Sequence, residues 1–276
     1  MPEGPEIRRV ADRLSRVLAH EMLETVYFGQ RKLKRFEGVL TGARVEAVTS
    51  RGKAMLTHFD SGLTLYTHNQ LYGRWYVQKR GRLPATNRTL RVALHTAERS
   101  ALLYSASEIA VLDRDQLASH PFLSGLGPDV LDSGLTWRTV AERLQSPAFR
   151  GRSLAALYLD QGFLAGVGNY LRSEILFDAA VNPFAKPKNL TRGTLGRLAR
   201  STLNICQRAY ATAGITNPPQ RVRRLQRKGA TRRQFRFAVF DRPGEPCYLC
   251  GEPIVRTEAG SRRLYLCECC QSAGPL

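Results

Sequence analysis

The sequence contains no long apolar run. No stretch approaches the roughly 18 consecutive apolar residues of a membrane-spanning helix, and the opening residues, MPEGPEIRR, lack the apolar core of a signal peptide. These absences predict a soluble, cytoplasmic protein with no membrane partner. Hydrophobic residues still make up 43% of the 276-residue chain, which excludes wholesale disorder, and the length suggests two domains with a small appendage.

Acidic residues are scarce. The chain has 23 Asp and Glu against 42 Lys and Arg, which leaves a formal net charge of +19. This excess favours a polyanionic partner, and nucleic acid is the first candidate. Ribosomal proteins and membrane-surface binders share the same charge balance, so charge alone does not choose among these classes.

Basic residues are densest in residues 221–236, RVRRLQRKGATRRQFR, which hold eight Lys or Arg and no acid. A run of this kind is usually a solvated, mobile loop. Because it directly precedes a cysteine-rich region, we predict a mobile loop that binds the phosphates of a nucleic acid.

Cysteine is absent from the first 205 residues, and five of the six cysteines lie in the last 30. Two C-x-x-C pairs, separated by 16 residues, can each chelate a metal from a tight turn, and the spacer is long enough for a β-hairpin. The pattern predicts one structural zinc ion bound by four thiolates, those of Cys247, Cys250, Cys267 and Cys270. Two disulfides are the alternative, which a cytoplasmic chain disfavours. Cys269 could compete as a ligand, whereas Cys206 in LNICQ is predicted to be a buried hydrophobe.

The first part of the chain is patterned as one helix followed by strands. Apolar residues recur at spacings of three and four from Ile7 to Leu18, with Pro2 and Pro5 at the start, where a missing N–H costs little. Seven short β-like runs follow between residues 22 and 107, with Gly, Asp, Ser and Asn in the breaks. This alternation predicts an antiparallel sandwich or barrel.

The pattern changes near Gly127 and Pro128, beyond which four segments have helical periodicity: TWRTVAERLQ, SLAALYLDQG, NYLRSEILFDAA and TRGTLGRLARSTLNICQRAY. Gly166 and Gly168 separate the second from the third. We predict a helix–turn–helix-like corner whose second helix starts at Asn169. The free N–H groups of a helix start suit a phosphate, although a plain loop between packed helices explains the glycines equally well.

The N-terminus carries possible chemistry. Met1 is ordinarily removed when the second residue is small, and its removal would leave Pro2 as a secondary amine. Because α-amino groups have a pKa near about 8, part of this amine is unprotonated at neutral pH and can attack an aldehyde-level carbon. Glu3 lies beside it as a carboxyl that can move protons. On local grounds alone, a proline that merely starts a helix is the commoner case.

Five segments occur together and in order: MPEGPEIRR at the start, SRGKAML around Lys53, THNQLYGRW at residues 67–75, LDQGFLAGVGNYLRSEIL at residues 159–176, and C-x2-C-x16-C-x2-C at the end. The set resembles the formamidopyrimidine-DNA glycosylase/endonuclease VIII family over essentially the whole chain. MPEGPEI and QLYG resemble the bacterial endonuclease VIII branch most closely. The purine-directed branch usually begins MPELPEVE and has a Met-containing loop in place of QLY.

The resemblance implies roles for residues at the N-terminus. Pro2 would be the nucleophile that attacks C1′ of a damaged nucleotide, and Glu3 would be the acid that protonates the sugar and opens its ring. Lys53 corresponds to the lysine of the family that contacts phosphate and donates a proton. Glu6 matches another position near the active site, or simply caps the first helix.

The resemblance also implies a role for the zinc hairpin. Arg262, five residues before Cys267, corresponds to the arginine that binds the phosphates flanking the lesion and supports the second elimination. Arg263 is adjacent, so a one-residue ambiguity remains, and only one face of a hairpin strand can point at the site. The zinc itself would be structural, since four thiolates leave no open coordination position.

Four further residues correspond to DNA contacts of the family. Gln70, Leu71 and Tyr72 match the loop that fills the gap left by a flipped nucleotide, and Asn169 matches a residue that binds a phosphate beside the lesion. One departure is Gly125, which stands where close relatives often have a basic, DNA-facing residue. We therefore expect one DNA contact to be missing or supplied elsewhere.

Together these observations predict an α+β multidomain protein. Residues 1–127 would form a β-sandwich led by the catalytic N-terminal helix, residues 128–237 a helix–two-turn–helix domain with the basic loop 221–236, and residues 238–276 a four-cysteine zinc finger, with DNA in the cleft between the halves. The expected partner is damaged double-stranded DNA. The expected state is a monomer at the nucleoid of a bacterial cytoplasm.

The expected activity is that of a bifunctional DNA glycosylase and abasic-site lyase. It would remove oxidised pyrimidines in base excision repair through a proline Schiff base and nick the strand by β,δ-elimination. Two alternatives stay open: a glycosylase of the same family directed at oxidised purines, and a non-catalytic zinc-containing DNA-binding protein. The sequence does not choose the preferred lesion, the opposite base or the extent of the second elimination.

Overall fold

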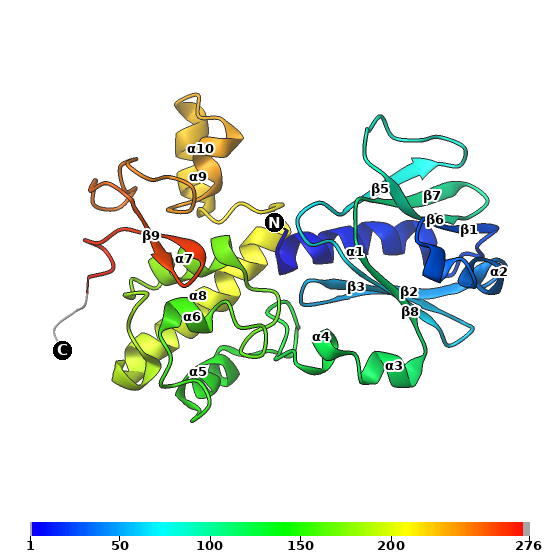
Figure 1. The fold of residues 1–276 in the computed structure, drawn as a ribbon. Helices are drawn as coiled ribbons and strands as arrows, with labels where there is room; N and C mark the ends of the chain where they lie inside the picture. The colour runs from blue at the N-terminus through cyan, green and yellow to red at the C-terminus, as the bar shows by residue number, and fades with distance from the viewer. Residues whose placement is uncertain (1, 273–276) are drawn as a thin grey trace. The chain divides into compact units, whose positions relative to one another are not determined.

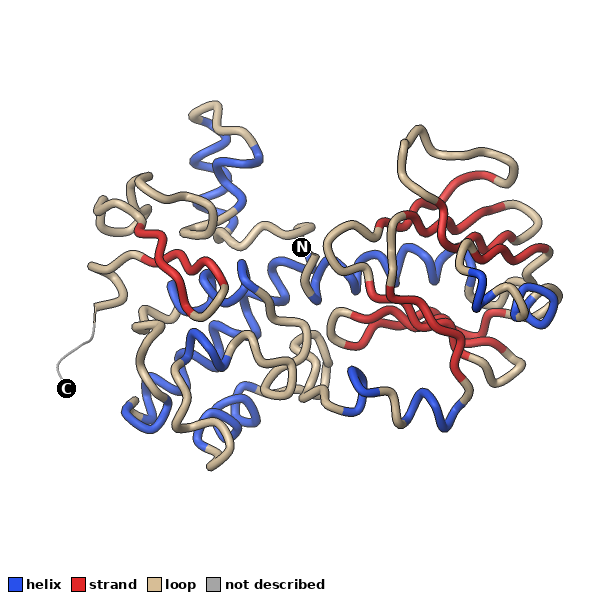
Figure 2. The backbone as a smooth tube through the Cα atoms, viewed as in Figure 1, coloured by secondary structure: helices blue, strands red, loops and turns tan. Residues whose placement is uncertain are grey.

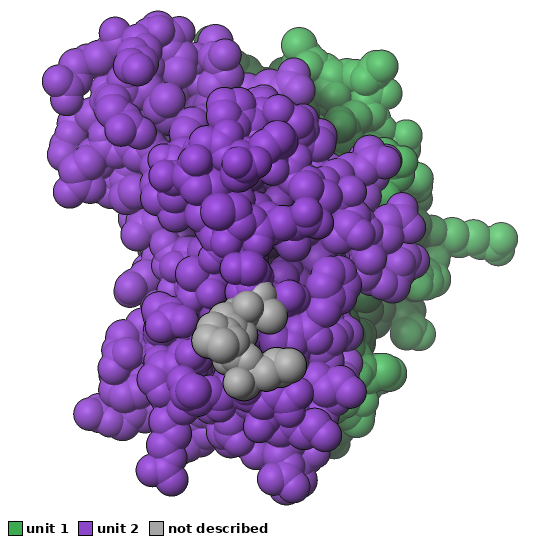
Figure 3. All heavy atoms as spheres, turned by 90° about the vertical axis from the view of Figure 1, so that its left-hand side faces the viewer, with its two compact units in different colours: residues 1–125 green, residues 126–276 purple. Residues whose placement is uncertain are grey.

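The computed structural model describes residues 2–272. The chain divides into two compact units, residues 1–125 and 126–276, which Figure 1 shows as ribbons and Figure 3 distinguishes by colour. No helix within residues 2–272 is long and apolar enough to cross a membrane. The further division of the second unit at residue 237 stays a prediction.

Unit 1 contains two four-stranded antiparallel sheets (Figure 2). One has the order β1-β6-β7-β5 and the other β2-β3-β4-β8. The strands are β1 (Thr25–Phe28), β2 (Val45–Arg51), β3 (Ala54–Phe59), β4 (Thr64–His68), β5 (Arg74–Lys79), β6 (Leu90–His95), β7 (Arg99–Tyr104) and β8 (Glu108–Leu112). The predicted β-sandwich is therefore confirmed, and each of the seven predicted runs overlaps one of these strands.

The first helix, α1 (Gly4–Leu18), packs against strands of both sheets. Its buried face carries Ile7, Ala11, Leu14 and Leu18, the spacing of three and four that the sequence predicted. These side chains share one core with apolar residues of all eight strands, from Phe28 of β1 to residues 109 and 111 of β8. The N-terminal residues are thus attached to the sandwich core by a well-buried helix.

The sequence patterns missed the shorter elements of unit 1. These are the eighth strand and four short helices: η1 (Arg31–Leu33), α2 (Phe36–Leu40), α3 (Arg114–Ala118) and α4 (Pro121–Ser124). Helices of three to five residues are too short to develop a visible 3.6-residue period. α3 begins instead with a capping box, in which Asp113 accepts a hydrogen bond from the backbone N–H of Gln116 at 2.8 Å.

Unit 2 is mainly helical and ends in a β-hairpin. Its elements are α5 (Trp137–Gln145), α6 (Leu154–Leu157), α7 (Asn169–Asp178), η2 (Pro187–Asn189), α8 (Arg192–Ala211), α9 (Pro219–Arg227), α10 (Arg232–Arg236), β9 (Val255–Ala259) and β10 (Arg262–Leu266). The second helix of the predicted corner starts at Asn169, as expected. The segment SLAALYLDQG forms only the short α6, and turns occupy most of the chain between it and α7.

The prediction of a loop over residues 221–236 is wrong, because this basic run belongs to two helices, α9 and α10. Pro219 starts α9, whose Arg, Gln and Leu residues favour helix. Gly229, with φ of 78°, allows the turn between them. α10 is capped by Gln234, whose Oε1 accepts a hydrogen bond from the backbone N–H of Thr231 at 2.8 Å. Within this charged run, α9 has no buried residue, whereas α10 buries Phe235.

A buried carboxylate organises the middle of unit 2. Glu174, on α7, is only 1% exposed. Its two carboxylate oxygens accept hydrogen bonds from the backbone N–H groups of Ala238, Val239 and Phe240, each at 2.8 Å, and from the hydroxyl of Thr216. One side chain thereby fixes the chain where it leaves α10 and approaches the cysteine-rich region.

We expect Glu174→Ala to lower the free energy of unfolding by at least about 3 kcal/mol, because each buried donor left without a partner costs about 1–3 kcal/mol. Urea unfolding followed by circular dichroism measures the loss. Glu142→Ala is the control, since Glu142 also lies on a helix of unit 2, α5, but is exposed. Equal stability of the two variants would contradict this account of Glu174.

Candidate active site and metal centre

The start of α1 places two predicted catalytic residues next to each other. Pro2 directly precedes Glu3, the N-cap of the helix, and the side chain of Glu3 lies inside the unit, where the residue is only 2% exposed. The Glu6 carboxylate accepts a hydrogen bond from the backbone N–H of Glu3 at 3.0 Å. Glu6 therefore caps the helix, one of the two roles that the sequence allowed. Met1 lies outside the described residues.

Pro2 borders a pocket of about 260 Å³. Its lining comes from α1 and from the chain around the start of β5: Pro2, Glu6, Ile7, Val10, Arg13, Asn69, Gly73, Arg74 and Trp75. Asn69 Oδ1 and Trp75 Nε1 are buried and have no hydrogen-bond partner within residues 2–272. Both residues belong to the lining of the pocket that Pro2 borders.

Two arginines, Arg13 and Arg74, line this pocket together with the acidic Glu6. Arg13 donates from Nη2 to the backbone carbonyl of Trp75 at 2.9 Å, and Arg74 lines the same pocket. Burial lowers the pKa of Arg13, and the charge of Arg74 lowers it further.

Lys53 lies in the turn between β2 and β3, where Gly52 has a φ of 60°. The residue is 8% exposed, which is unusual for a lysine and indicates a defined environment rather than a solvated one. The positive charge of Lys53 also affects the pKa of His68, the last residue of β4. Burial lowers the pKa of His68 and the Lys53 ammonium lowers it further, while Glu108 acts in the opposite direction.

The segment between β4 and β5 carries the three residues predicted to enter DNA. Leu71 and Tyr72 are 61% and 68% exposed, although both side chains are large and apolar or aromatic. Gln70 adopts the left-handed conformation, with φ of 47°. Large exposed apolar side chains at the tip of a polar loop are typical of a surface that contacts a partner.

Asn169 begins α7 directly after Gly168, and its side chain is held by Arg172. The Arg172 guanidinium donates to Asn169 Oδ1 at 2.6 Å and to the backbone carbonyls of Ala155 and Arg263, both at 2.9 Å. Arg172 is fully buried. One arginine therefore links the start of α7 to β10 of the hairpin, a connection that the sequence did not reveal.

The β9–β10 hairpin carries the two candidate arginines. Arg262 pairs with Ala259 and Arg263 with Glu258, and both arginines are exposed. Along β10, Arg262 shares a face with Leu264, and the next residue, Arg263, lies on the opposite face. The backbone of Arg263 is fixed by Arg172, so the hairpin presents both side chains from a rigid base. The choice between the two arginines stays a prediction.

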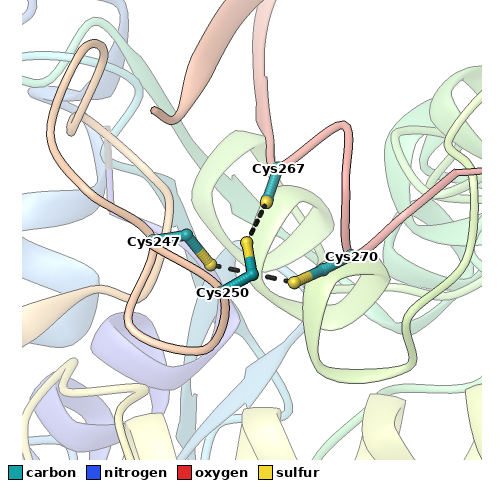
Figure 4. Close-up of side chains that lie close together, drawn as sticks. All are labelled: Cys247, Cys250, Cys267 and Cys270. Carbon is teal, nitrogen blue, oxygen red and sulfur yellow. Dashed lines mark hydrogen bonds between the residues drawn. The ribbon is translucent and has the colours of Figure 1, made fainter. Parts of the chain in front are cut away.

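The four cysteines of the two C-x-x-C pairs converge on one point (Figure 4). The sulfur atoms of Cys247, Cys250, Cys267 and Cys270 all lie within 4.8 Å of one another. Cys250 Sγ and Cys267 Sγ are 3.4 Å apart, and Cys247 Sγ and Cys270 Sγ are 3.9 Å apart. Tetrahedral zinc with Zn–S distances of about 2.3 Å places sulfur atoms about 3.8 Å apart. The thiolate set and its spacing fit a zinc ion.

The remaining two cysteines lie outside this cluster. Cys269 is exposed and does not belong to the group of four converging sulfur atoms. Cys206 is fully buried on α8 within the helical core, as predicted for a small hydrophobe. The four-ligand set that the two-residue spacing favoured is therefore the one that the fold brings together.

Family models match both units. The model of the formamidopyrimidine-DNA glycosylase N-terminal domain matches residues 1–108, and that of the formamidopyrimidine-DNA glycosylase H2TH domain matches residues 126–218. Among curated relatives, Endonuclease 8 of Salmonella arizonae is 49% identical and Endonuclease 8 of Escherichia coli O17:K52:H18 is 50% identical, each over 271 residues that cover 98% of this chain and 100% of the relative.

Solved structures show the same fold. Formamidopyrimidine-DNA glycosylase of Lactococcus lactis bound to DNA with an abasic site matches with a TM-score of 0.78 at 18% identity, covering 98% of this chain and 99% of that one. Its complex with DNA containing an oxidised pyrimidine matches with a TM-score of 0.80, covering 98% and 100%. With both family models, near-full-length relatives and this fold in agreement, the chain belongs to the formamidopyrimidine-DNA glycosylase family.

Proposed function

We propose that this protein is a bifunctional DNA glycosylase and abasic-site lyase of base excision repair that acts on oxidised pyrimidines. The observation that carries the proposal is the 49–50% identity to Endonuclease 8 over 98% of the chain. Its damaged-DNA substrate is supported by the Lactococcus lactis relatives, whose solved structures hold damaged DNA. We further propose that it acts as a monomer on the nucleoid of a bacterial cell.

The chemistry would begin at the N-terminus. With Met1 removed, the uncharged amine of Pro2 attacks C1′ of the damaged nucleotide, the base departs, and an iminium (Schiff base) joins Pro2 to the sugar. The buried Glu3 carboxyl supplies the proton that opens the sugar ring. Elimination of the 3′-phosphate and then the 5′-phosphate nicks the strand.

The other site residues would bind and reshape DNA. Lys53, from unit 1, and Asn169 and Arg262, from unit 2, would bind phosphates around the lesion. Because the reacting carbon is inside the duplex, the nucleotide must be flipped out at a cost of a few kcal/mol. The exposed Leu71 and Tyr72 would offset this cost by filling the gap. The basic helices α9 and α10 would add non-specific phosphate binding.

The proposed metal is one structural zinc ion, which the four clustered cysteines would hold. Four thiolates saturate tetrahedral zinc, so the ion supplies no Lewis acid or activated water. Its contribution would be to stabilise the turns on both sides of the β9–β10 hairpin, from which Arg262 projects.

Substrate class is tested by cleavage of duplexes that contain one thymine glycol or one 8-oxoguanine. We expect efficient cleavage of the thymine glycol strand and weak cleavage of the 8-oxoguanine strand. Preference for 8-oxoguanine would move the protein to the purine-directed branch. Absence of cleavage with retained DNA binding would favour a non-catalytic DNA-binding protein.

The two hairpin arginines give a matched pair of variants. We expect Arg262→Ala to slow strand nicking by about 10²-fold, the usual loss when one donor to a developing anion is removed. Arg263→Ala should change nicking little, because the variant keeps the backbone carbonyl of residue 263 that accepts a hydrogen bond from Arg172. Single-turnover nicking of a pre-formed abasic duplex provides the measurement. A larger effect for Arg263→Ala would assign the role to that residue instead.

A further inference from the structure

Glu108, at the start of β8, is the centre of a hydrogen-bonded cluster beside the loop of residues 69–73. Its Oε1 accepts a hydrogen bond from the hydroxyl of Tyr66 at 2.7 Å, and its Oε2 accepts one from Nε2 of Gln70 at 3.0 Å. His68 is opposite Glu108 in the β4–β8 register, and its Nδ1 lies 3.7 Å from Glu108 Oε2. The edge strand β8, which pairs with β4, thus contacts the loop proposed to enter DNA.

Both ends of the Gln70 amide are occupied by this cluster. While Nε2 donates to Glu108, Oε1 accepts a hydrogen bond from the Ser107 hydroxyl at 2.9 Å. The backbone N–H of Gln70 donates to His68 Nδ1 at 3.3 Å. These two bonds fix the orientation of the amide, although each uses only one of its two donor hydrogens and one of its two acceptor sites.

We propose that Ser107 and Glu108 are positioning residues that hold Gln70 in a resting conformation and release it when the loop enters damaged DNA. This inference rests on the proposed role of Gln70 as a ligand of the unpaired base. The neighbouring side chains of Leu71 and Tyr72 are already exposed, whereas the amide of Gln70 is hydrogen-bonded to Glu108 and Ser107.

When the Gln70 amide leaves this cluster, few polar groups are left without a hydrogen-bond partner. Glu108 keeps the hydroxyl of Tyr66, a residue that is 1% exposed and fixed in the sheet, as a partner after Gln70 departs. Glu108 and Ser107 are themselves accessible to water, which can replace the lost bonds.

The test measures binding to a duplex with a non-cleavable tetrahydrofuran abasic analogue, by the dissociation constant and by the association rate in stopped flow. Removing one resting-state hydrogen bond with Ser107→Ala should strengthen binding by about 2- to 10-fold. Glu108→Ala should act in the same direction, with folding checked by circular dichroism. Ser61→Ala, in the exposed turn before β4, is the matched control and should leave binding unchanged.

The decisive comparison uses Gln70→Ala as a background. If Ser107 acts through Gln70, Ser107→Ala changes nothing once Gln70 is alanine, whereas a merely structural role of Ser107 would persist. The proposal is overturned if Ser107→Ala alone binds the duplex more weakly than, or as strongly as, the wild-type protein. It is also overturned if Gln70→Ala alone binds the duplex as strongly as the wild-type protein. Failure of the wild-type protein to cleave thymine glycol duplexes would instead count against the proposed function, independently of these binding data.

Discussion

Blocking the amine of Pro2 with a short N-terminal extension is expected to abolish base excision and strand nicking together. Both reactions pass through the same bond between this nitrogen and C1′, so removing the nucleophile leaves no second route. Loss of an essential group of this kind costs on the order of 10⁴-fold or more in rate. The measurement is single-turnover cleavage of a thymine glycol duplex and of a pre-formed abasic duplex.

The same extension placed at the C-terminus is the control and should leave both rates unchanged. Pro2→Gly should keep part of the activity, because glycine still offers an α-amine in the same place. Normal nicking by the N-terminally extended protein would show that another residue is the nucleophile.

Loss of the metal is expected to have an effect of similar size on nicking by a different route. In small zinc modules, metal binding contributes about 10–16 kcal/mol to the folded state. The two C-x-x-C turns of this chain bring their four sulfur atoms within 4.8 Å of one another. Cys250→Ser or chelation should therefore disorder the region around the hairpin and abolish nicking, as measured beside the zinc content of the same sample.

Cys269→Ser is the matched control for this prediction, since Cys269 is an adjacent exposed cysteine outside the four-sulfur cluster. It should retain one zinc per chain and full nicking. A zinc-free protein that still nicks abasic DNA would contradict the structural role of the metal. Recovery of nicking by a chelated sample on addition of zinc would support it.

Local patterns in the sequence were sufficient where the structure depends on local rules. The buried face of α1 follows the three-and-four spacing from Ile7 to Leu18, and α7 starts at Asn169, directly after the glycine that forms its N-cap. The cysteine cluster follows from the spacing of two C-x-x-C pairs, because metal geometry restricts which side chains can meet.

Features that depend on contacts between distant segments were not predictable in this way. Arg172 on α7 bonds the carbonyl of Arg263, 91 positions along the chain, and Glu108 on β8 bonds Gln70, 38 positions away. The pocket beside Pro2 brings Asn69 and Trp75 to α1 through the packing of the sandwich. No periodicity marks such pairs, since tertiary packing alone brings them together.

The basic run over residues 221–236 was predicted wrongly although local signals for its helices were present. Composition indicated a solvated loop, because eight charges of one sign repel and no apolar face is visible. The structure instead has two helices that begin at Pro219 and at the residue after Thr231, where a proline and a capping box supply the start signals. Start signals at the helix ends were therefore more informative than the charge of the run.

The most direct test of the central claim is borohydride trapping of the protein on an abasic duplex, followed by peptide mapping of the linked residue. A Schiff-base enzyme is reduced to a stable covalent adduct with DNA, and the account predicts one adduct, carried by the N-terminal peptide at the nitrogen of Pro2. No trapped adduct, or an adduct mapped to Lys53 or to any other lysine, would contradict it.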